Sequence, residues 1–364
     1  MNITIVAGAR PNFMKIAPII EAIQHKRSEG FNINYRLVHT GQHYDKNLSG
    51  AFFEELNIPL PDSNLEVKSG TQAEQTAAIM IGFEKELRLN PCDLVMVVGD
   101  VTSTMACTIV AKKAHIKVTH VEAGIRSGDM RMPEEINRIV TDSLTDYFFT
   151  TSTYANENLE RLGISKSNIF FVGNVMIDTL LKNKNRFKKP KLWDNLMLSN
   201  KNYLVMTLHR PSNVDEEEQL KALITKIVEL GKDYPIVFPV HPRTQKLLSN
   251  LNLNFKNLHY VNPLGYLEFN YLVENAKAVI TDSGGITEET TVMNVPCITL
   301  RNSTERPETC NIGTNILVGN DSKKIESAFN VLLSGAWKQG HIPELWDGQA
   351  AKRIIHHITH IYKL

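Results

Sequence analysis

Carboxylates next to apolar segments are the first candidates for chemistry in this chain. Asp100 and Glu122 come just after apolar, β-rich runs, and Glu134 stands at the start of a helical pattern. Burial beside such a run would raise the pKa of Glu122 toward the range of a general acid or base. Carboxylates that lie close together push their pKa values apart, so this set could supply one acid and one base. Helix capping explains Asp100 and Glu134 one at a time, but it explains all three residues together less readily.

Two turns with glycine lie between an apolar run and a helical pattern. The first covers residues 8–15, and its Arg10 and Lys15 bring positive charge to the start of a helix. The second has three small residues in a row: Ser283, Gly284 and Gly285. Backbone N–H groups at such helix starts bind phosphate, so we predict a diphosphate site, with Glu289 one turn further on to accept ribose hydroxyls. Ordinary strand–helix turns are the alternative. The first turn matches no dinucleotide or ATP motif, so neither a nicotinamide cofactor nor ATP is indicated.

Other polar residues end predicted strands in both halves of the chain. The polar stretch around Gln42 offers hydrogen-bond donors for a sugar or nucleotide, although an ordinary polar turn explains it equally well. In the second half, the residues that end strands are His209, Arg210, His241 and Arg306. His356 and His360, near the end of the chain, have the i, i+4 spacing of a zinc site, but no carboxylate or cysteine stands near them in the sequence. We therefore predict a surface or interface helix there and no metal.

The elements that position these residues follow one pattern, in which short apolar runs alternate with longer helical stretches. In the first half, strands are predicted at residues 3–7, 35–39, 94–98, 118–121, 147–150 and 169–172. The intervening helices are predicted at residues 13–26, 72–89, 102–114, 133–144 and 154–162. Runs that are apolar on both faces indicate a parallel sheet with helices on both sides.

The same alternation resumes after residues 182–202, a segment rich in Lys, Asn and Asp that we predict to lie on the surface near a domain junction; anion binding there is the weaker alternative. The later strands are predicted at residues 203–206, 236–239, 258–261, 278–281 and 297–300. The later helices are predicted at residues 216–230, 266–276, 285–293, 322–333 and 350–363.

This pattern predicts an α/β protein with two Rossmann-like, doubly wound domains facing a central cleft, where the loops at the carboxyl ends of the strands converge. The N-terminal domain, residues 1–173, would carry the acid–base residues. The C-terminal domain, residues 174–349, would carry the diphosphate site. The terminal helix, 350–364, could pack back on the first domain.

Composition excludes several classes of protein. The chain has 364 residues, of which 42% are hydrophobic and 22% charged, and a net charge of +1, so charge does not favour nucleic acid or a membrane surface. No apolar run approaches the roughly 20 residues of a membrane helix, and the N-terminus has no signal-peptide pattern. The four cysteines are far apart and show no metal-ligand spacing, which favours reduced thiols and a cytoplasmic protein.

Taken together, these segments resemble the non-hydrolysing UDP-N-acetylglucosamine 2-epimerases of bacteria and archaea. The resemblance covers residues 1–320 and is carried, in order, by Gly8-Ala9-Arg10-Pro11, Gly41-Gln42-His43, Gly99-Asp100, His120-Val121-Glu122-Ala123-Gly124, Pro133-Glu134-Glu135, His209-Arg210, Asp282-Ser283-Gly284-Gly285 and Thr304-Glu305-Arg306-Pro307. It implies a GT-B-like fold, a homodimer, and interconversion of UDP-GlcNAc and UDP-ManNAc for cell-surface polysaccharide. The implied route eliminates UDP to give a 2-acetamidoglucal and adds it back after C2 is protonated from the other face, with no cofactor.

The resemblance also implies roles for single residues. The catalytic set is Asp100, Glu122, Glu134 and His209. The residues that bind UDP are Arg10, Lys15, Phe269, Ser283, Gly284, Gly285, Glu289 and Arg306, with Phe269 near the uracil. Many bacterial members bind a second UDP-GlcNAc as an activator, and the positions that match that site are Gln42, Glu135, Arg210 and His241.

Two departures and several rivals accompany this resemblance. Residues 128–133 form a shorter loop than in the enterobacterial enzymes, and Thr287 stands where many members have Gln. The rivals are a hydrolysing epimerase that releases ManNAc and UDP, an epimerase of a UDP-diacetamido-sugar uronate, a retaining glycosyltransferase and a UDP-sugar sensor without activity. The 304–307 segment and the residues that match the activator site favour the non-hydrolysing over the hydrolysing type. A glycosyltransferase would not need the three carboxylates, and a sensor would not need every catalytic position occupied. The uronate epimerase remains open, because those relatives share residues 132–138.

Overall fold

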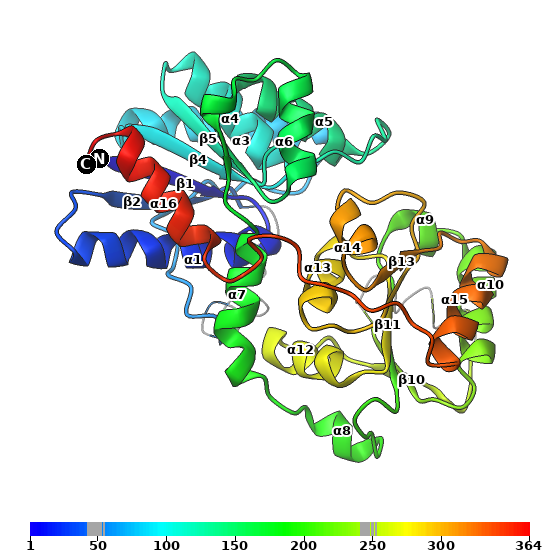
Figure 1. Ribbon diagram of the computed structural model, residues 1–364. Helices are drawn as coiled ribbons and strands as arrows, with labels where there is room; N and C mark the ends of the chain where they lie inside the picture. The colour runs from blue at the N-terminus through cyan, green and yellow to red at the C-terminus, as the bar shows by residue number, and fades with distance from the viewer. Residues whose placement is uncertain (42–52, 54, 241–247, 249–250, 252) are drawn as a thin grey trace. The chain divides into compact units, whose positions relative to one another are not determined.

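The computed structural model describes residues 1–41, 53, 55–240, 248, 251 and 253–364. Within them the chain forms two compact units (Figure 1). The first consists of Met1–Lys182 and Glu344–Leu364, and the second of Asn183–Pro343. Residues 174–182 and 344–349 therefore belong with the first unit, although the domain limits predicted from the sequence assigned them to the C-terminal domain. One reason is a hydrogen bond that the Thr179 hydroxyl donates to the Met14 carbonyl at 2.6 Å.

The first unit contains a parallel sheet of seven strands in the order β3-β2-β1-β4-β5-β6-β7. The strands are β1 Asn2–Ala7, β2 Asn34–His39, β3 Ser63–Asn64, β4 Leu94–Val98, β5 Lys117–Val121, β6 Tyr147–Thr150 and β7 Ile169–Phe171. The α-helices are α1 Arg10–Ser28, α3 Gln72–Leu89, α4 Thr102–Lys113, α5 Pro133–Leu144, α6 Thr153–Arg161, α7 Val175–Asn183 and α16 Ala350–Ile361. The reversal of strand order beside β1 puts the loops after β1 and β4 at the switch point where such sheets bind ligands.

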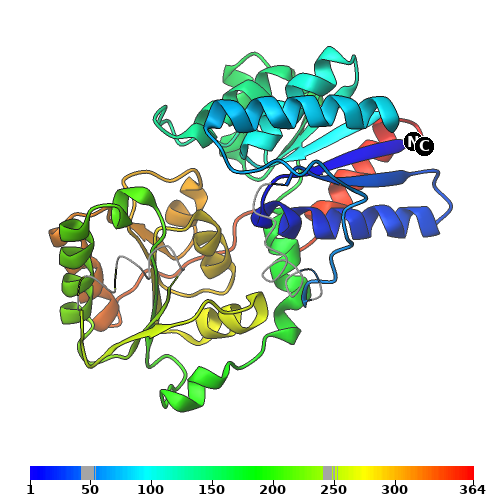
Figure 2. The same ribbon diagram turned by 180° about the vertical axis from the view of Figure 1, so that it is seen from behind.

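Helices cover both faces of this sheet, which is why its strands are apolar on both sides. On one face α3 and α4 pack against valines of the four adjacent strands: Val6, Val38, Val95, Val97 and Val118. Figure 2 shows α3 across the sheet on the side opposite α1. The terminal helix α16 lies beside α1 (Figure 1) and is fixed by Asp178, whose carboxylate accepts from the Ala350 and Ala351 N–H groups at 3.1 and 2.7 Å.

The second unit repeats this architecture with six parallel strands in the order β10-β9-β8-β11-β12-β13. The strands are β8 Leu204–Thr207, β9 Ile236–Pro239, β10 Leu258–Val261, β11 Ala278–Thr281, β12 Cys297–Thr299 and β13 Asn315–Leu317. The α-helices are α8 Lys191–Asn195, α9 Pro211–Val214, α10 Glu217–Leu230, α12 Tyr266–Asn275, α13 Gly284–Val292, α14 Pro307–Asn311 and α15 Ser322–Leu333. The switch point lies beside β8, so the loops after β8 and β11 are the corresponding ligand positions.

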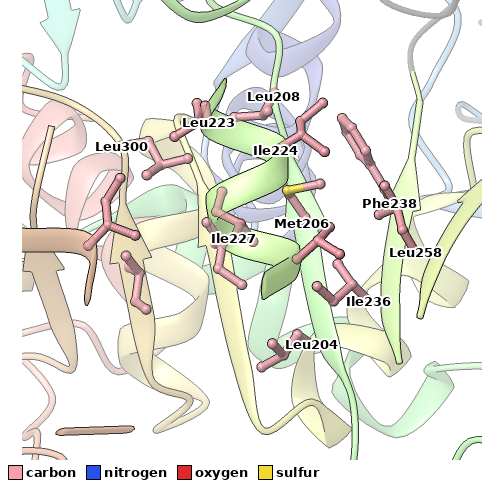
Figure 3. Packing of buried hydrophobic residues seen from close by; sticks show 14 of the residues in the cluster. Leu204, Met206, Leu208, Leu223, Ile224, Ile227, Ile236, Phe238, Leu258 and Leu300 are labelled. Carbon is pink, nitrogen blue, oxygen red and sulfur yellow. The ribbon is translucent and has the colours of Figure 1, made fainter. Parts of the chain in front are cut away.

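The core of the second unit shows how its helices are held on the sheet. Figure 3 shows Ile224 and Ile227 of α10 packed over Met206, Ile236 and Phe238. All five side chains are fully buried. Burial of each large apolar side chain stabilises the fold by about 1.5–3 kcal/mol, so this layer firmly anchors the strands whose ends carry the polar residues.

The predicted α/β fold with two parallel, doubly wound sheets is confirmed, and the differences are local. The sequence missed two short strands, β3 and β13, and the helices α7, α8, α9 and α14. The segment expected to be plain surface, residues 182–202, contains α8, where Trp193 packs edge-on against Tyr203 and Tyr271. All four cysteines are free thiols. Among the described residues, none of the helices combines the length and apolarity that crossing a membrane requires.

Candidate active site

The turn between β1 and α1 is built by a buried asparagine. The Asn12 side-chain oxygen accepts from the Gly8 and Ala9 N–H groups at 3.1 and 3.0 Å, and its amide donates to the Val98 carbonyl at 3.0 Å. Asn12 therefore joins the ends of β1 and β4. Gly8 is required by close packing, because a Cβ there would lie 2.4 Å from the Ser103 hydroxyl oxygen.

Two of the predicted carboxylates meet at the ends of β4 and β5. Arg138 of α5 donates to Asp100 Oδ2 through Nε and Nη2 at 3.1 and 2.7 Å, and its Nη1 donates to the Glu122 main-chain carbonyl at 2.8 Å. The Glu122 carboxylate lies 2.6 Å from Lys15 Nζ and 3.9 Å from Arg138 Nη2. Buried charges are stable only when paired, and here both carboxylates have a cation in contact.

The backbone at this edge takes up a conformation that most residues avoid. Glu122 has a φ of 69°, in the left-handed region, and Gly99 has a φ of 72°. Left-handed residues with side chains cost conformational energy and persist where surrounding contacts hold them. The Arg138 bond to the Glu122 carbonyl is such a contact, and the Glu122 N–H donates to the Phe149 carbonyl at 3.0 Å.

A buried histidine, His120 of β5, links this edge of the sheet to α5. His120 contacts Asp142 Oδ1 through Nδ1 at 2.6 Å and the Gly99 carbonyl through Nε2 at 2.8 Å. Burial alone would raise the pKa of Asp142, but the charges and hydrogen bonds of His120 and Arg126 hold it below its usual range. Helix α5 thus reaches the ends of both β4 and β5, through Arg138 and Asp142.

The two glutamates at the start of α5 have different surroundings. Glu134 is exposed, whereas Glu135 is buried and accepts from the Ser127 N–H and hydroxyl at 2.7 and 2.8 Å. Glu135 therefore fixes the loop after β5. Glu134 is exposed and lies one helical turn before Arg138 on α5.

The second unit has its own buried carboxylate at the strand ends. Asp282, after β11, accepts from the main-chain N–H groups of His209 and Arg210 and from the Asn213 side chain, all at 3.0–3.2 Å. Its Oδ1 also lies 2.7 Å from His209 Nδ1, while the His209 side chain is 53% exposed. Burial would raise the pKa of Asp282, but His209 and these donors hold it below its usual range. The imidazole is thereby oriented with one edge held and the other toward solvent.

The turn after Asp282 leads into α13 with little side-chain bulk. The Ser283 N–H donates to the Thr281 hydroxyl at 3.0 Å, and Gly284 begins the helix. A Cβ on Gly284 would lie 3.6 Å from an Arg301 guanidinium nitrogen, and Arg301 forms two hydrogen bonds with Glu305 at 2.9 and 2.7 Å. A helix N-terminus with small residues and a nearby guanidinium suits a phosphate group.

Behind this turn lies a cluster of buried acidic residues. Burial raises the pKa of Glu289 to about 7, although the Tyr266 hydroxyl donates to it at 2.9 Å. Burial likewise raises the pKa of Glu308 to about 7. Glu288, the third buried acidic residue here, is paired with Arg306, which is itself buried. Arg306 therefore stabilises the interior of this unit.

A family model for UDP-N-acetylglucosamine 2-epimerases matches residues 25–359. The chain belongs to this epimerase family. It is 41% identical to the UDP-N-acetylglucosamine 2-epimerase of Methanocaldococcus jannaschii, over 99% of both chains. A crystal structure of the M. jannaschii enzyme in complex with UDP-GlcNAc and UDP superposes with a TM-score of 0.87, at 41% identity, and covers 99% of this chain and 100% of that one. A UDP-2,3-diacetamido-2,3-dideoxy-D-glucuronate 2-epimerase of Pseudomonas aeruginosa is 36% identical over 99% of both chains.

The site residues predicted for this epimerase family are partly brought together. In the first unit Asp100, Glu122 and Lys15 share one network, in which Lys15 pairs with a carboxylate. In the second unit the loops after β8 and β11 join His209 and Arg210 to the Ser283 turn.

Other predicted residues lie apart or outside the described part. Phe269, on α12, is half-buried and packs against an apolar core cluster of the second unit. Gln42 and His241 lie outside the described residues, and of Arg10 only the backbone, at the first position of α1, is described. Across the described residues, no group of three or more His, Cys, Asp or Glu side chains could hold a metal ion.

Several residues with clear roles in the site were not singled out from the sequence. These are Asn12, Arg138, Asp142, Asp282 and Arg301. Arg138 and Asp282 stood inside segments already noted, since Arg138 lies four residues after Glu134 and Asp282 directly precedes Ser283. Their type gave a signal, since Arg and Asp are almost never buried unless paired.

Proposed function

We propose that this protein catalyses the reversible epimerisation of UDP-GlcNAc to UDP-ManNAc at C2. The observation that carries the proposal is the network of Lys15, Glu122, Arg138 and Asp100 at the ends of β4 and β5, in a chain of the 2-epimerase family. Acid–base chemistry at a carbon needs carboxylates held in defined positions, and this network provides them.

The two units divide the work in this proposal. The second unit binds UDP, with the diphosphate at the Ser283-Gly284-Gly285 turn and the ribose at Glu289. Its His209, oriented by Asp282, interacts with the leaving diphosphate. Arg10 and Phe269 contribute to the same nucleotide, as the family resemblance implies. The first unit supplies the acid–base set Asp100, Glu122 and Glu134.

The proposed reaction is an elimination followed by an addition. A base removes the C2 proton, the C–H electron pair becomes the C1=C2 double bond, and the C1–O bond breaks with its electrons going to UDP. Protonation of C2 from the other face and return of UDP to C1 give the epimer. Positive groups and backbone N–H donors stabilise the departing diphosphate, and no net oxidation takes place.

An alternative substrate has specific support. The Pseudomonas relative acts on a UDP-diacetamido-glucuronate according to its name, and its 36% identity extends over 99% of this chain. The same acid–base set would serve that sugar, because the reaction is again at C2. Discrimination between the two substrates would depend on the loop at residues 128–133, which lies between β5 and α5.

The finer expectations remain proposals. We propose a homodimer, a second UDP-GlcNAc that binds as an activator, and a role in supplying ManNAc units for cell-surface polysaccharide. In the activator site, Glu135 and Arg210 would take part with Gln42 and His241. A cytoplasmic location is supported by the four free cysteines, since disulfides are rare in that compartment.

The test is incubation with UDP-GlcNAc in D2O, followed by NMR of the sugar protons. We expect UDP-ManNAc with deuterium at C2, deuterium at C2 in the recovered UDP-GlcNAc, and no free ManNAc. Parallel incubation with UDP-2,3-diacetamido-2,3-dideoxy-D-glucuronate tests the alternative. Free ManNAc together with UDP would show hydrolysis instead, and a lack of exchange with both sugars would contradict the proposed function.

A further inference from the structure

The four charged side chains of the network lie at different depths. The Asp100 side chain is 30% exposed, and the Lys15 side chain is 12% exposed. Arg138 is 3% exposed and Glu122 is fully buried, at 0%. The network therefore has an outer carboxylate and an inner one, with the two cations between them.

The inner carboxylate, that of Glu122, is held through contacts of both its side chain and its backbone. Glu122 Oε2 contacts Lys15 at 2.6 Å, and its backbone, which has a φ of 69°, is bound on both sides by hydrogen bonds to Phe149 and Arg138. A carboxylate held in this way cannot move to a substrate without separating from the Lys15 ammonium, whereas Arg138 would still face Asp100. A buried charge that loses its partner is strongly unfavourable in a protein interior.

The outer carboxylate is positioned by the same arginine. Two nitrogens of Arg138 bind Asp100 Oδ2, and the Asn137 amide donates to the Asp100 carbonyl at 2.8 Å. Because Arg138 also lies against Glu122, the orientation of Asp100 depends on the charge of Glu122. A proton-transfer group has to come within hydrogen-bond distance of the atom it serves, and Asp100 is the carboxylate of this pair with surface to do so.

We propose that Glu122 is a positioning residue, the buried anion that fixes Lys15 and Arg138, and that Asp100 is the carboxylate of this pair that exchanges a proton with C2 of the sugar. This inference rests on the proposed epimerase function and divides the roles within its acid–base set. In the elimination direction, Asp100 takes the C2 proton, the C–H electrons form the C1=C2 bond, and the C1–O electrons leave with UDP. Glu122 keeps its charge throughout.

A double-mutant cycle separates the two roles of Glu122. In Glu122→Gln, the Lys15 ammonium loses its counter-charge, and kcat is expected to fall by about 100-fold while UDP binding persists. Removal of both charges in Lys15→Met/Glu122→Gln is expected to restore kcat at least about 10-fold over Glu122→Gln, because no unpaired ammonium remains. A double variant that is as slow as, or slower than, Glu122→Gln would overturn the proposal.

The pH profile gives a second readout that a loss of folding would not produce. Removal of the negative charge at residue 122 makes a neighbouring carboxylate lose its proton more readily. The acid limb of kcat/KM, if it reports Asp100, is therefore expected to persist in Glu122→Gln and to move to lower pH. A profile that loses its acid limb in Glu122→Gln and keeps it in Asp100→Asn would assign proton transfer to Glu122 and overturn the proposal.

A matched control is available in the same unit. Glu86 is also buried and paired with Arg36 at 2.6 Å, but it lies near the C-terminal end of α3, where Ser63 and Asn90 also donate to it. Glu86→Gln is expected to lower the melting temperature while it leaves kcat and the pH profile unchanged. The wild-type protein is assayed first in D2O. Failure of that assay counts against the epimerase function, whereas a working wild type with an additive double-mutant cycle counts only against the role of Glu122.

Discussion

Two regions of the molecule hold carboxylates in contrasting surroundings, one at the ends of strands and one within two helices. At the ends of β4 and β5, Asp100 and Glu122 contact cations directly, with Lys15 and Arg138 within hydrogen-bond reach. Around α13 and α14, burial prevails and raises the pKa of Glu289 and of Glu308 to about 7. The two regions therefore differ in what acts on their carboxylates: cations lie against those of the first region, whereas burial is the main cause of the raised pKa values in the second.

This difference fits the tasks that we propose for the two regions. A group that exchanges protons with a carbon needs a fixed position within hydrogen-bond reach of it. A group that binds ribose hydroxyls can stay neutral until the ligand arrives. The predictions below test each half of this comparison, beginning with the largest expected effect.

Removal of Arg138, the cation that faces both carboxylates of the first region, should have the greatest consequence. Arg138→Met leaves Asp100 and Glu122 close together with one fewer positive charge. We expect the free energy of unfolding to fall by about 3–5 kcal/mol, as when one partner of a buried ion pair is removed, and epimerisation to be lost. Urea unfolding followed by circular dichroism measures the first effect and the D2O exchange assay the second.

The control for this experiment is an arginine at the surface of the same unit. Arg131 pairs with Asp129 at 2.8 Å, but its side chain is 90% exposed. Exposed ion pairs contribute little, so Arg131→Met should leave the urea midpoint unchanged. Equal destabilisation by the two substitutions would show that the Arg138 network is no stronger than a surface pair, and the comparison would fail.

The fold was largely predictable because its signal is local. Strands at residues 94–98, 147–150, 236–239, 258–261 and 278–281 match the structure, since an apolar run covered by helices on both faces stands out from polar loops. The two-residue strand β3 was missed because it has no apolar run, and β13 because its run, which begins at Ile316, is short. Helix α1 begins at Arg10, earlier than predicted, since Asn12 holds the turn before it.

The site was predictable in its residue types and not in its pairings. The sequence placed Lys15 with the diphosphate, whereas the structure pairs it with Glu122, 107 positions away in the chain. Such a contact depends on which strands are neighbours, and no local sequence pattern indicates the order β1-β4-β5. Arg306 was likewise expected to bind UDP, and its contact with Glu288 became visible only once α13 and α14 were placed together. Both UDP-binding roles remain predictions.

The second region can be tested through pH. Because the pKa of Glu289 is raised from 4.5 to about 7, the folded protein holds a proton at pH 5–7 that the unfolded chain releases. The resulting stability is fully present at low pH and is lost as pH rises through about 7, by about 1–3 kcal/mol. Urea unfolding between pH 5 and pH 8.5 should show this loss, and Glu289→Gln should reduce it.

Glu308 serves as the control that separates a raised pKa from a role in UDP binding. Its pKa is raised to about 7 as well, but we assign it no contact with UDP. Ribose hydroxyls donate to an ionised carboxylate, so UDP binding at pH 6.5 should release a proton from Glu289. Calorimetry in buffers of different ionisation enthalpy should detect the proton in the wild type and in Glu308→Gln, and should not detect it in Glu289→Gln. Proton release that survives in Glu289→Gln would remove Glu289 from the ribose site.

The smallest expected effects concern two glycines, Gly8 in the turn after β1 and Gly284 at the first position of α13. A Cβ at Gly8 would lie 2.4 Å from the Ser103 hydroxyl oxygen and 2.9 Å from Val101 Cγ2, whereas at Gly284 the nearest atom is 3.6 Å away. Gly8→Ala should therefore cost about 1–2 kcal/mol of stability through overpacking, and Gly284→Ala should cost almost none.

The effects of these two substitutions on UDP binding should have the reverse order, with the larger effect at Gly284. A methyl group on Gly284 would stand where the diphosphate has to approach the N–H groups of α13, so Gly284→Ala should weaken UDP binding about tenfold, or about 1.4 kcal/mol. Uridine, which lacks phosphate, should bind both proteins equally. Since Gly284→Ala leaves the fold intact, unchanged affinity for UDP would mean that the Ser283-Gly284-Gly285 turn does not hold the diphosphate, and the second region would lose the role that the comparison gives it.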